Sequence, residues 1–268
     1  MTEYPVWVPS GDHQCAAVIT VPDGDARALV VLVPGGGGAP RSHRFALWTR
    51  LARALTGKGF ATVRLEWEGI GDSTGDPTFS FRTPNVGDLM AVTTFASEVL
   101  GVERIGLAGN CFGARTILYS FDRLPSASSV AILLVKPLAR VGTAGRGALA
   151  MRRLVRLVPG LRRPARLLYW RVKGRGRGGP LAEKLRAVAA RANVLLLESD
   201  SGVAGSLPRL IQALRGAGGA PLIEMRSLPG DSLQDLRASE DQQALIDTLA
   251  AWFDRSLAPH EAALQAGS

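Results

Sequence analysis

The chain has 268 residues, a length that suits one large domain or a domain with an inserted cap. Hydrophobic residues make up 46% and charged residues 21%, a globular composition that excludes a coiled coil, collagen or long disorder as the main state. Lysine and arginine outnumber aspartate and glutamate by 32 to 23, and a net charge of +9 favours an acidic partner such as nucleic acid, a membrane surface or an acidic protein.

The cellular compartment is predicted from the cysteines and the N-terminus. Cys15 and Cys111 are the only cysteines, too few for a disulfide framework, so we expect two thiols in a reducing compartment. The first residues lack a basic segment followed by an apolar stretch, and no apolar run approaches the ~18 residues of a spanning helix. We therefore expect a cytoplasmic protein without a signal peptide.

The first half of the chain alternates strand and helix patterns. Strands are predicted at 4–8 and 14–20, joined by a turn at 10–12, and a solid apolar run at 28–33 leads into Pro34 and four glycines. A strand at 60–65 then runs into the loop WEGIGDSTGD. Between them, a helix ending at Gly57 is predicted from one apolar face: Phe45, Trp48, Ala52 and Leu55.

The second half continues this alternation. Helices are predicted at 88–100, 114–121 and 207–214, and strands at 104–108, 130–135, 194–197 and 222–228. The last helix opens with the capping-box pattern Ser-Glu-Asp-Gln at 239–242. The order predicts an α/β fold with a mostly parallel sheet, helices on both faces and an antiparallel edge formed by the first two strands.

The segment Gly-Asn-Cys-Phe-Gly at 109–113 lies between a predicted strand and a predicted helix. Glycines two residues before and after Cys111 permit a sharp turn that would expose this residue above the sheet at a helix N-terminus. The helix dipole there favours the thiolate. The alternative is a buried structural cysteine at a packed turn.

The chain resembles the α/β-hydrolase superfamily in its PGGGG loop, its LEWEGIGDSTG stretch, its GNCFG elbow and its insertion after the sixth strand. It is most similar to hydrolases associated with exosortase systems, which share the Ser-His-Arg stretch seen here at 42–44, a GxGDS loop and a cysteine elbow. The elbow is also similar to that of dienelactone hydrolases and hydrolase-like Dieckmann cyclases. The resemblance implies nucleophilic acyl chemistry at Cys111. Backbone N–H groups of Gly36 and Phe112 could form the oxyanion hole.

The usual catalytic triad is incomplete. Asp200 is a candidate acid, but Asp231 stands near the position where the family would place its histidine. His43 could act as a substitute base or bind substrate, or it could be structural and hydrogen-bond the neighbouring loop. His260 is expected to be a solvated tail residue, His13 a surface residue and Cys15 a core thiol.

A thiol can work partly without a base, because some thiolate exists near neutral pH. Attack on a thioester exchanges one thioester for another, whereas hydrolysis needs an activated water. The sequence therefore favours an enzyme that transfers, cyclises or releases an acyl chain through an acyl-Cys111 intermediate. The alternatives are a carboxylester or thioester hydrolase with a non-standard base, and a degenerate hydrolase-like binding protein. No cofactor and no metal ion are expected.

The positive charge is concentrated in residues 139–192, which hold fifteen Lys or Arg and one acid, a charge of +14, while the rest of the chain carries −5. We interpret this segment as a helical cap inserted into a core formed by 1–138 and 193–268. It could be a cap with solvated arginines, a docking site for an acidic acyl carrier protein, or, less favoured, a membrane contact. Nucleic acid is not expected, because no recognised module supports it. The docking residues would be Arg152, Arg153, Arg156, Arg162 and Arg163.

Overall fold

A computed structural model describes residues 1–35, 39–77, 84–124, 127–133, 180–199, 223–228 and 239–258. Within these residues the strands are β1 (Thr2–Ser10), β2 (His13–Val21), β3 (Leu29–Val33), β4 (Ala61–Leu65), β5 (Ile105–Asn110), β6 (Ala127–Leu133), β7 (Asn193–Ser199) and β8 (Ile223–Leu228). They form a single sheet in the order β1-β2-β4-β3-β5-β6-β7-β8.

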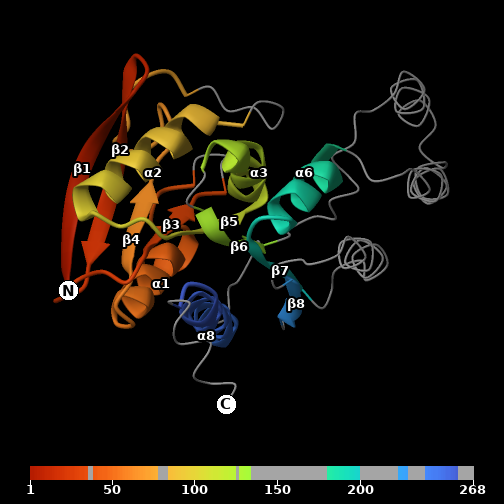
Figure 1. Ribbon diagram of the computed structural model, residues 1–268. Coiled ribbons are helices and arrows are strands. Elements are labelled where there is room, and N and C mark those ends of the chain that lie inside the picture. Colours follow the sequence, from red (N-terminus) through yellow and green to blue (C-terminus); the bar gives the residue numbers. More distant parts are fainter. Residues whose placement is uncertain are drawn as a thin grey trace, which may run out of the picture.

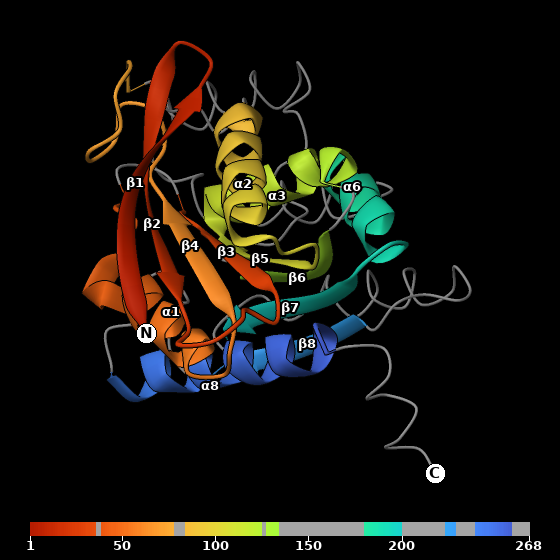
Figure 2. The ribbon, with the colours of Figure 1, turned by 60° about the vertical axis from the view of Figure 1, so that its left-hand side comes forward.

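The sheet is mixed but mostly parallel. β1 pairs antiparallel with β2, and β2 pairs antiparallel with β4, whereas every pair from β4 to β8 is parallel. The expected antiparallel edge is confirmed, and Figure 2 shows β1 and β2 along one side of the twisted sheet.

Helices cover both faces of the sheet (Figures 1 and 2). They are α1 (Leu47–Thr56), α2 (Val86–Leu100), α3 (Cys111–Ser120), α6 (Pro180–Ala189) and α8 (Ser239–Ser256), with short 3-10 turns at Arg44–Ala46 and Phe121–Arg123. α2, α3 and α6 lie on one face, and α1 and α8 lie on the other.

The two faces of the sheet bury separate hydrophobic clusters, because successive side chains of a strand point to opposite sides. In β3, Leu29, Val31 and Val33 join the cluster under α2, α3 and α6, while Val30 and Leu32 join the cluster under α1 and α8. A strand buried on both faces must be apolar at every position, which is the pattern that predicted β3 as a central strand.

The predicted elements in the described residues are confirmed with shifted boundaries and one misplaced side chain. β5 continues to Asn110, and α3 begins directly at Cys111, so no loop separates them. Phe45 was expected on the buried face of α1 but is 55% exposed. The reason is local: Phe45 has a left-handed φ of 56° within the 3-10 turn, so it is out of phase with the helix that begins at Leu47.

The last part of the predicted cap segment packs with the core. Leu185, Val188 and Ala189 of α6 belong to the same cluster as α2 and α3, and Lys184 forms an ion pair of 2.8 Å with Asp122 after α3. The remainder of that segment, 139–179, and the helix predicted at 207–214 lie outside the described residues. No helix in the described part of the chain is long and apolar enough to cross a bilayer.

Candidate active site

Cys111 lies at the carboxyl edge of the parallel strands, where α/β sheets place their binding sites. In the sheet register Val33, the last residue of β3, is opposite Gly109 of β5. The end of β3 and the start of α3 therefore meet at this edge. Cys111 is the first residue of α3, and its side chain is partly exposed.

The backbone at Cys111 is strained. Its φ is 50°, in the left-handed region that L-residues other than glycine avoid, directly after Asn110 in an extended conformation. A residue held in this way stores of the order of 1–3 kcal/mol, and such strain clusters at functional sites. This is the geometry that the GNCFG pattern predicted.

The two glycines of the elbow are required by close packing. A Cβ on Gly113 would lie 2.6 Å from the carbonyl oxygens of both Val33 and Pro34, and a Cβ on Gly109 would lie 2.9 Å from the backbone nitrogen of Ala114. These contacts involve backbone atoms that cannot swing aside. The N-terminal turn of α3 therefore rests directly on the end of β3.

His43 is linked to the elbow through Asn110, the residue before Cys111. The side-chain amide of Asn110 donates to His43 Nε2 at 3.0 Å, and the His43 ring packs against Trp48 with centroids 5.1 Å apart. Burial lowers the pKa of His43 below its ordinary 6.5, so the ring is neutral near pH 7. This hydrogen bond is the kind that a structural histidine would make. A catalytic role for His43 stays a prediction.

Phe112 is one of the two predicted oxyanion-hole residues. Its backbone N–H donates to the carbonyl oxygen of Gly35 at 3.2 Å. Its ring is buried and packs edge-on against Trp67 with centroids 5.7 Å apart. The carbonyl of Gly35 therefore occupies this predicted donor, and the oxyanion-hole role of Phe112 stays a prediction. Gly36, the other predicted donor, lies outside the described residues.

A buried carboxylate joins two loops beside the elbow. Glu66 Oε2 accepts hydrogen bonds from the Arg41 guanidinium and from the backbone N–H of Asp72 at 2.9 Å, and Arg41 also pairs with the Asp72 carboxylate at 2.8 Å. Gly71 must be a glycine, because a Cβ there would lie 2.3 Å from the Glu66 carboxylate. We name Arg41, Glu66 and Asp72 the Glu66 brace. The sequence indicated the GxGDS loop but not this carboxylate.

Several predicted site residues lie outside the described part of the chain. These are Asp200 and Asp231, the candidate acid and the residue near the expected histidine position. The same holds for His260 and for the predicted docking residues Arg152, Arg153, Arg156, Arg162 and Arg163. Their roles stay predictions.

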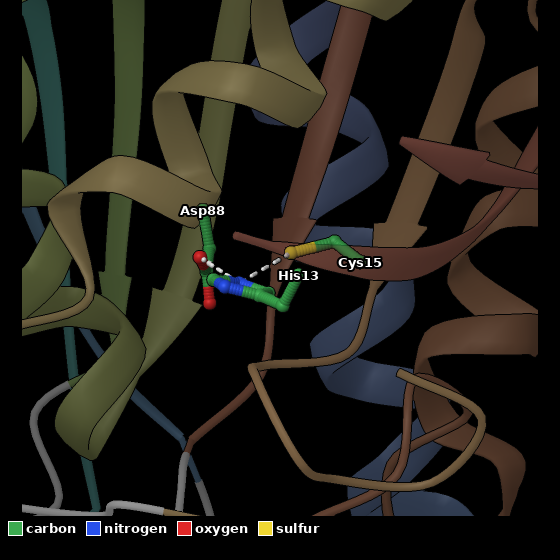
Figure 3. A group of neighbouring side chains, drawn as sticks. All are labelled: His13, Cys15 and Asp88. Atoms are coloured by element: carbon green, nitrogen blue, oxygen red, sulfur yellow. Dashed lines mark hydrogen bonds and ion pairs between the residues drawn. The ribbon is translucent and has the colours of Figure 1, made fainter. Parts of the chain in front are cut away.

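The prediction that His13 is a surface residue is wrong. Its side chain is 9% exposed, and its Nε2 lies 2.9 Å from Asp88 Oδ1 and 3.7 Å from Cys15 Sγ (Figure 3). Burial opposes protonation of His13, but the hydrogen bond and charge of Asp88 outweigh it and raise the pKa of His13. Burial, reinforced by Asp88, raises the pKa of the Cys15 thiol to about 12. Cys15 is fully buried, as expected of a core thiol.

Sequence reasoning missed this cluster because Asp88 is 73 positions from Cys15 along the chain. A signal was present, since His13 directly precedes the predicted strand at 14–20 and stands two residues from Cys15. In β2, which begins at His13, the two residues share one face. We name His13, Cys15 and Asp88 the β2–α2 cluster.

The eight-stranded, mostly parallel sheet and the sharp strand-to-helix turn at a strained cysteine are features of the α/β-hydrolase fold. A family profile described as "Alpha/beta hydrolase family" matches residues 30–265, and the chain belongs to this family. A search of curated proteins finds no match.

Solved structures share the fold at low sequence identity. An esterase from Pyrococcus furiosus is 10% identical with a TM-score of 0.65, and the alignment covers 96% of this chain and 92% of the esterase. A proline iminopeptidase from Mycobacterium smegmatis is 17% identical with a TM-score of 0.59, covering 95% and 99%. An alpha-beta serine hydrolase homologue from Coxiella burnetii is 19% identical with a TM-score of 0.55, covering 96% and 99%.

Proposed function

We propose that this protein is an acyl hydrolase in which Cys111 attacks the carbonyl of an ester or thioester and is acylated. The observation that carries the proposal is the elbow itself. Its first helical residue is a partly exposed cysteine with a φ of 50°, braced by glycines that admit no side chain. Membership of the α/β-hydrolase family supports hydrolysis as the class of reaction.

The thiol is well placed for this chemistry. At the N-terminus of α3 the helix dipole favours a negative charge on sulfur. The thiolate attacks the carbonyl carbon to form the C–S bond, and the carbonyl oxygen gains the charge. When this intermediate collapses, the bond to the leaving oxygen or sulfur breaks, and the leaving group departs as an alkoxide or thiolate that takes a proton from water.

The oxyanion would be held by the N–H of Phe112 together with that of Gly36. Because the Phe112 N–H donates to the Gly35 carbonyl, the substrate oxygen must displace this carbonyl. A rotation of the Gly35 peptide would release the donor. The substrate oxygen can displace the neutral Gly35 carbonyl only once it carries enough negative charge to bind the Phe112 N–H more strongly. The hydrogen bond therefore stabilises the transition state more than the ground state.

The second half of the reaction needs a base to activate water. His43 is neutral near pH 7, but in this arrangement its Nε2 lone pair accepts the Asn110 hydrogen bond. It would therefore serve first as a positioning residue for Asn110 and the elbow. Asp200 and Asp231 are the other candidates, as orienting acid and as the residue at the usual histidine position.

Acyl transfer or cyclisation is the second candidate function. It is favoured by one sequence observation: the chain has three histidines, and only His260 follows the last strand. Slow attack by water would leave the acyl-Cys111 adduct available to another nucleophile. The +14 charge of residues 139–192 would then suit an acidic acyl carrier protein as the donor.

The experiment incubates the full chain with short-chain esters and with acyl thioesters of coenzyme A, and follows intact mass and products. We expect an acyl adduct on the peptide that contains Cys111. Turnover should fall by roughly 10⁴-fold or more in Cys111→Ala, the scale on which loss of a hydrolase nucleophile acts. Cys15→Ala is the matched control that also removes one thiol and should keep the adduct.

The products separate the two candidate functions. Release of free acid supports hydrolysis, whereas acylation of an added amine or alcohol with little free acid supports transfer. A Cys111→Ala variant that turns substrate over as fast as the wild type would overturn both.

A further inference from the structure

The β2–α2 cluster brings three different metal-ligand atoms together away from the elbow. His13 and Cys15 project from the same face of β2, and Asp88 reaches them from the first turn of α2 (Figure 3). The imidazole Nε2, the Cys15 sulfur and a carboxylate oxygen of Asp88 all lie within 4.8 Å of one another. Cys15 is fully buried, and Asp88 is 4% exposed.

This arrangement is not a second Cys-His-Asp catalytic relay. In such a relay the acid contacts one ring nitrogen and the nucleophile contacts the other, so that a proton can pass along the ring. Here Asp88 and Cys15 both approach the same atom, His13 Nε2, at 2.9 and 3.7 Å. Three groups converging on one point are instead arranged as ligands of a common centre.

The two separations from His13 Nε2 are close to those of a tetrahedral metal site, and the Cys15 sulfur and the Asp88 carboxylate oxygen lie within 4.8 Å of each other. Bonds from zinc of about 2.0–2.1 Å to nitrogen or oxygen and about 2.3 Å to sulfur place neighbouring ligands roughly 3.3–3.6 Å apart. The observed 3.7 Å from Nε2 to sulfur already fits. The 2.9 Å from Nε2 to Asp88 Oδ1 needs to widen by only a few tenths of an ångström.

The surroundings of the cluster also match those of a metal-bound histidine, whose other ring nitrogen usually donates to a carboxylate. His13 Nδ1 lies 3.5 Å from Asp12 Oδ1 and 3.9 Å from Glu68 Oε1. The second oxygen of Asp88 is held by the backbone N–H of Glu68 at 3.0 Å, and the Ser10 hydroxyl donates to Oδ1 at 2.9 Å. Each candidate ligand outside the thiol is thereby oriented by a neighbour.

We propose that His13 Nε2, Cys15 Sγ and Asp88 Oδ1 bind a divalent zinc ion, with a water or the Ser10 hydroxyl in the fourth position. One thiolate, one carboxylate and one neutral imidazole balance a charge of +2, which suits a buried site. A set of nitrogen, sulfur and oxygen ligands favours zinc over magnesium or calcium, which prefer oxygen alone. This departs from the expectation, drawn from sequence, that the protein needs no metal.

The ion would fasten the β1–β2 hairpin to α2 and to the loop after β4. That loop is already bound to β2, because Thr74 donates its backbone N–H to the Gln14 carbonyl at 2.9 Å and Ser73 accepts the Ala16 N–H at 2.8 Å. A metal at this junction would therefore be structural, and it does not depend on the proposed acyl chemistry.

The test uses full-length protein treated with a chelator, dialysed and titrated with Co²⁺ and then Zn²⁺. We expect one equivalent of Co²⁺ to give a thiolate-to-cobalt charge-transfer band in the near ultraviolet, which Zn²⁺ then abolishes. The band should persist in Cys111→Ala, which removes the other thiol, and disappear in Cys15→Ala and His13→Ala. Zn²⁺ should raise the melting temperature of the wild type and of Cys111→Ala only.

Wild-type protein keeps the test decisive even where a cluster variant fails to fold. Cys111 is first blocked by alkylation, so that any thiolate band must come from Cys15. Absence of the band and of a zinc-dependent melting shift in this folded protein would overturn the proposal. A band that survives in folded Cys15→Ala, or vanishes in Cys111→Ala, would overturn it equally.

Discussion

The two cysteines of this chain occupy opposite kinds of environment. Cys111 begins a helix, is partly exposed and has a strained left-handed backbone. Cys15 is the third residue of β2, in the antiparallel part of the sheet, and is fully buried beside the Asp88 carboxylate. Because the two side chains are chemically identical, any difference in their reactivity is set by exposure, local backbone and neighbouring charge.

The largest difference should appear in alkylation. With a pKa of about 12, Cys15 has a thiolate fraction at pH 8 roughly 10³-fold below that of an ordinary thiol, and burial slows it further. In chelator-treated native protein, iodoacetamide should therefore modify Cys111 at least about 10³-fold faster. Peptide mass spectrometry over time measures both rates, and in guanidinium the two cysteines should react alike. Similar alkylation rates of Cys15 and Cys111 in native protein would contradict the expected difference in thiol reactivity.

The backbone difference should reverse the order of stability of two substitutions. At position 111, Cys111→Gly should be more stable than Cys111→Ala by about 1 kcal/mol, because glycine adopts a positive φ without steric strain. At position 15, which lies in a regular strand, Cys15→Ala should be more stable than Cys15→Gly by about 0.5–1 kcal/mol. Denaturant unfolding of the four variants measures both differences. The same order at both positions would contradict the assignment of strain to Cys111.

The smallest expected effect is the pH dependence of stability caused by His43, near Cys111, and by His13, beside Cys15. Burial lowers the pKa of His43 below 6.5, with the Arg44 charge acting in the same direction. Above pH 6.5 the His43 ring is neutral in both the folded and the unfolded chain, and its contribution to the free energy of unfolding is fully present. As the pH falls below 6.5, the unfolded chain binds the proton before the folded chain does, so this contribution decreases. The decrease ends once the pH is below the lowered pKa of His43 in the folded chain.

Unfolding measured at pH 7.5 and 5.5 tests this dependence. His43→Gln should show a smaller acid-induced loss than the wild type. His13→Gln should not reduce the loss, because the pKa of His13 is raised and its linkage has the opposite sign. An unchanged loss in His43→Gln would show that His43 is not the responsible group.

The sequence predicted the fold well because the patterns it contains are local. A strand buried on both faces is apolar at every residue, as in β3, and the final helix follows a capping box and a regular apolar stripe. The elbow was equally local, since two glycines and a cysteine within five residues specify both the turn and the strain. Phe45 was misplaced because two left-handed residues before α1, Phe45 and Ala46, break the helical phase.

The parts that sequence reasoning missed depend on contacts between distant residues. Nothing near His13 indicates that Asp88 will lie beside it, because their meeting requires β2 and the first turn of α2 to be placed by the whole sheet. The same is true of the link between Asn110 and His43, which joins residues 67 positions apart. A loop histidine looks the same in a sequence whether it is exposed or held in this way.

The Glu66 brace has a practical consequence for altering the protein. Arg41 lies after the glycine loop and Asp72 lies after β4, yet both are held by the Glu66 carboxylate. Exchanging either loop alone for one from a relative would leave the buried Glu66 carboxylate without some of its partners. Such a loss costs of the order of 3–5 kcal/mol of folding free energy. Loop exchanges intended to change specificity should therefore replace residues 39–43 and 66–77 together.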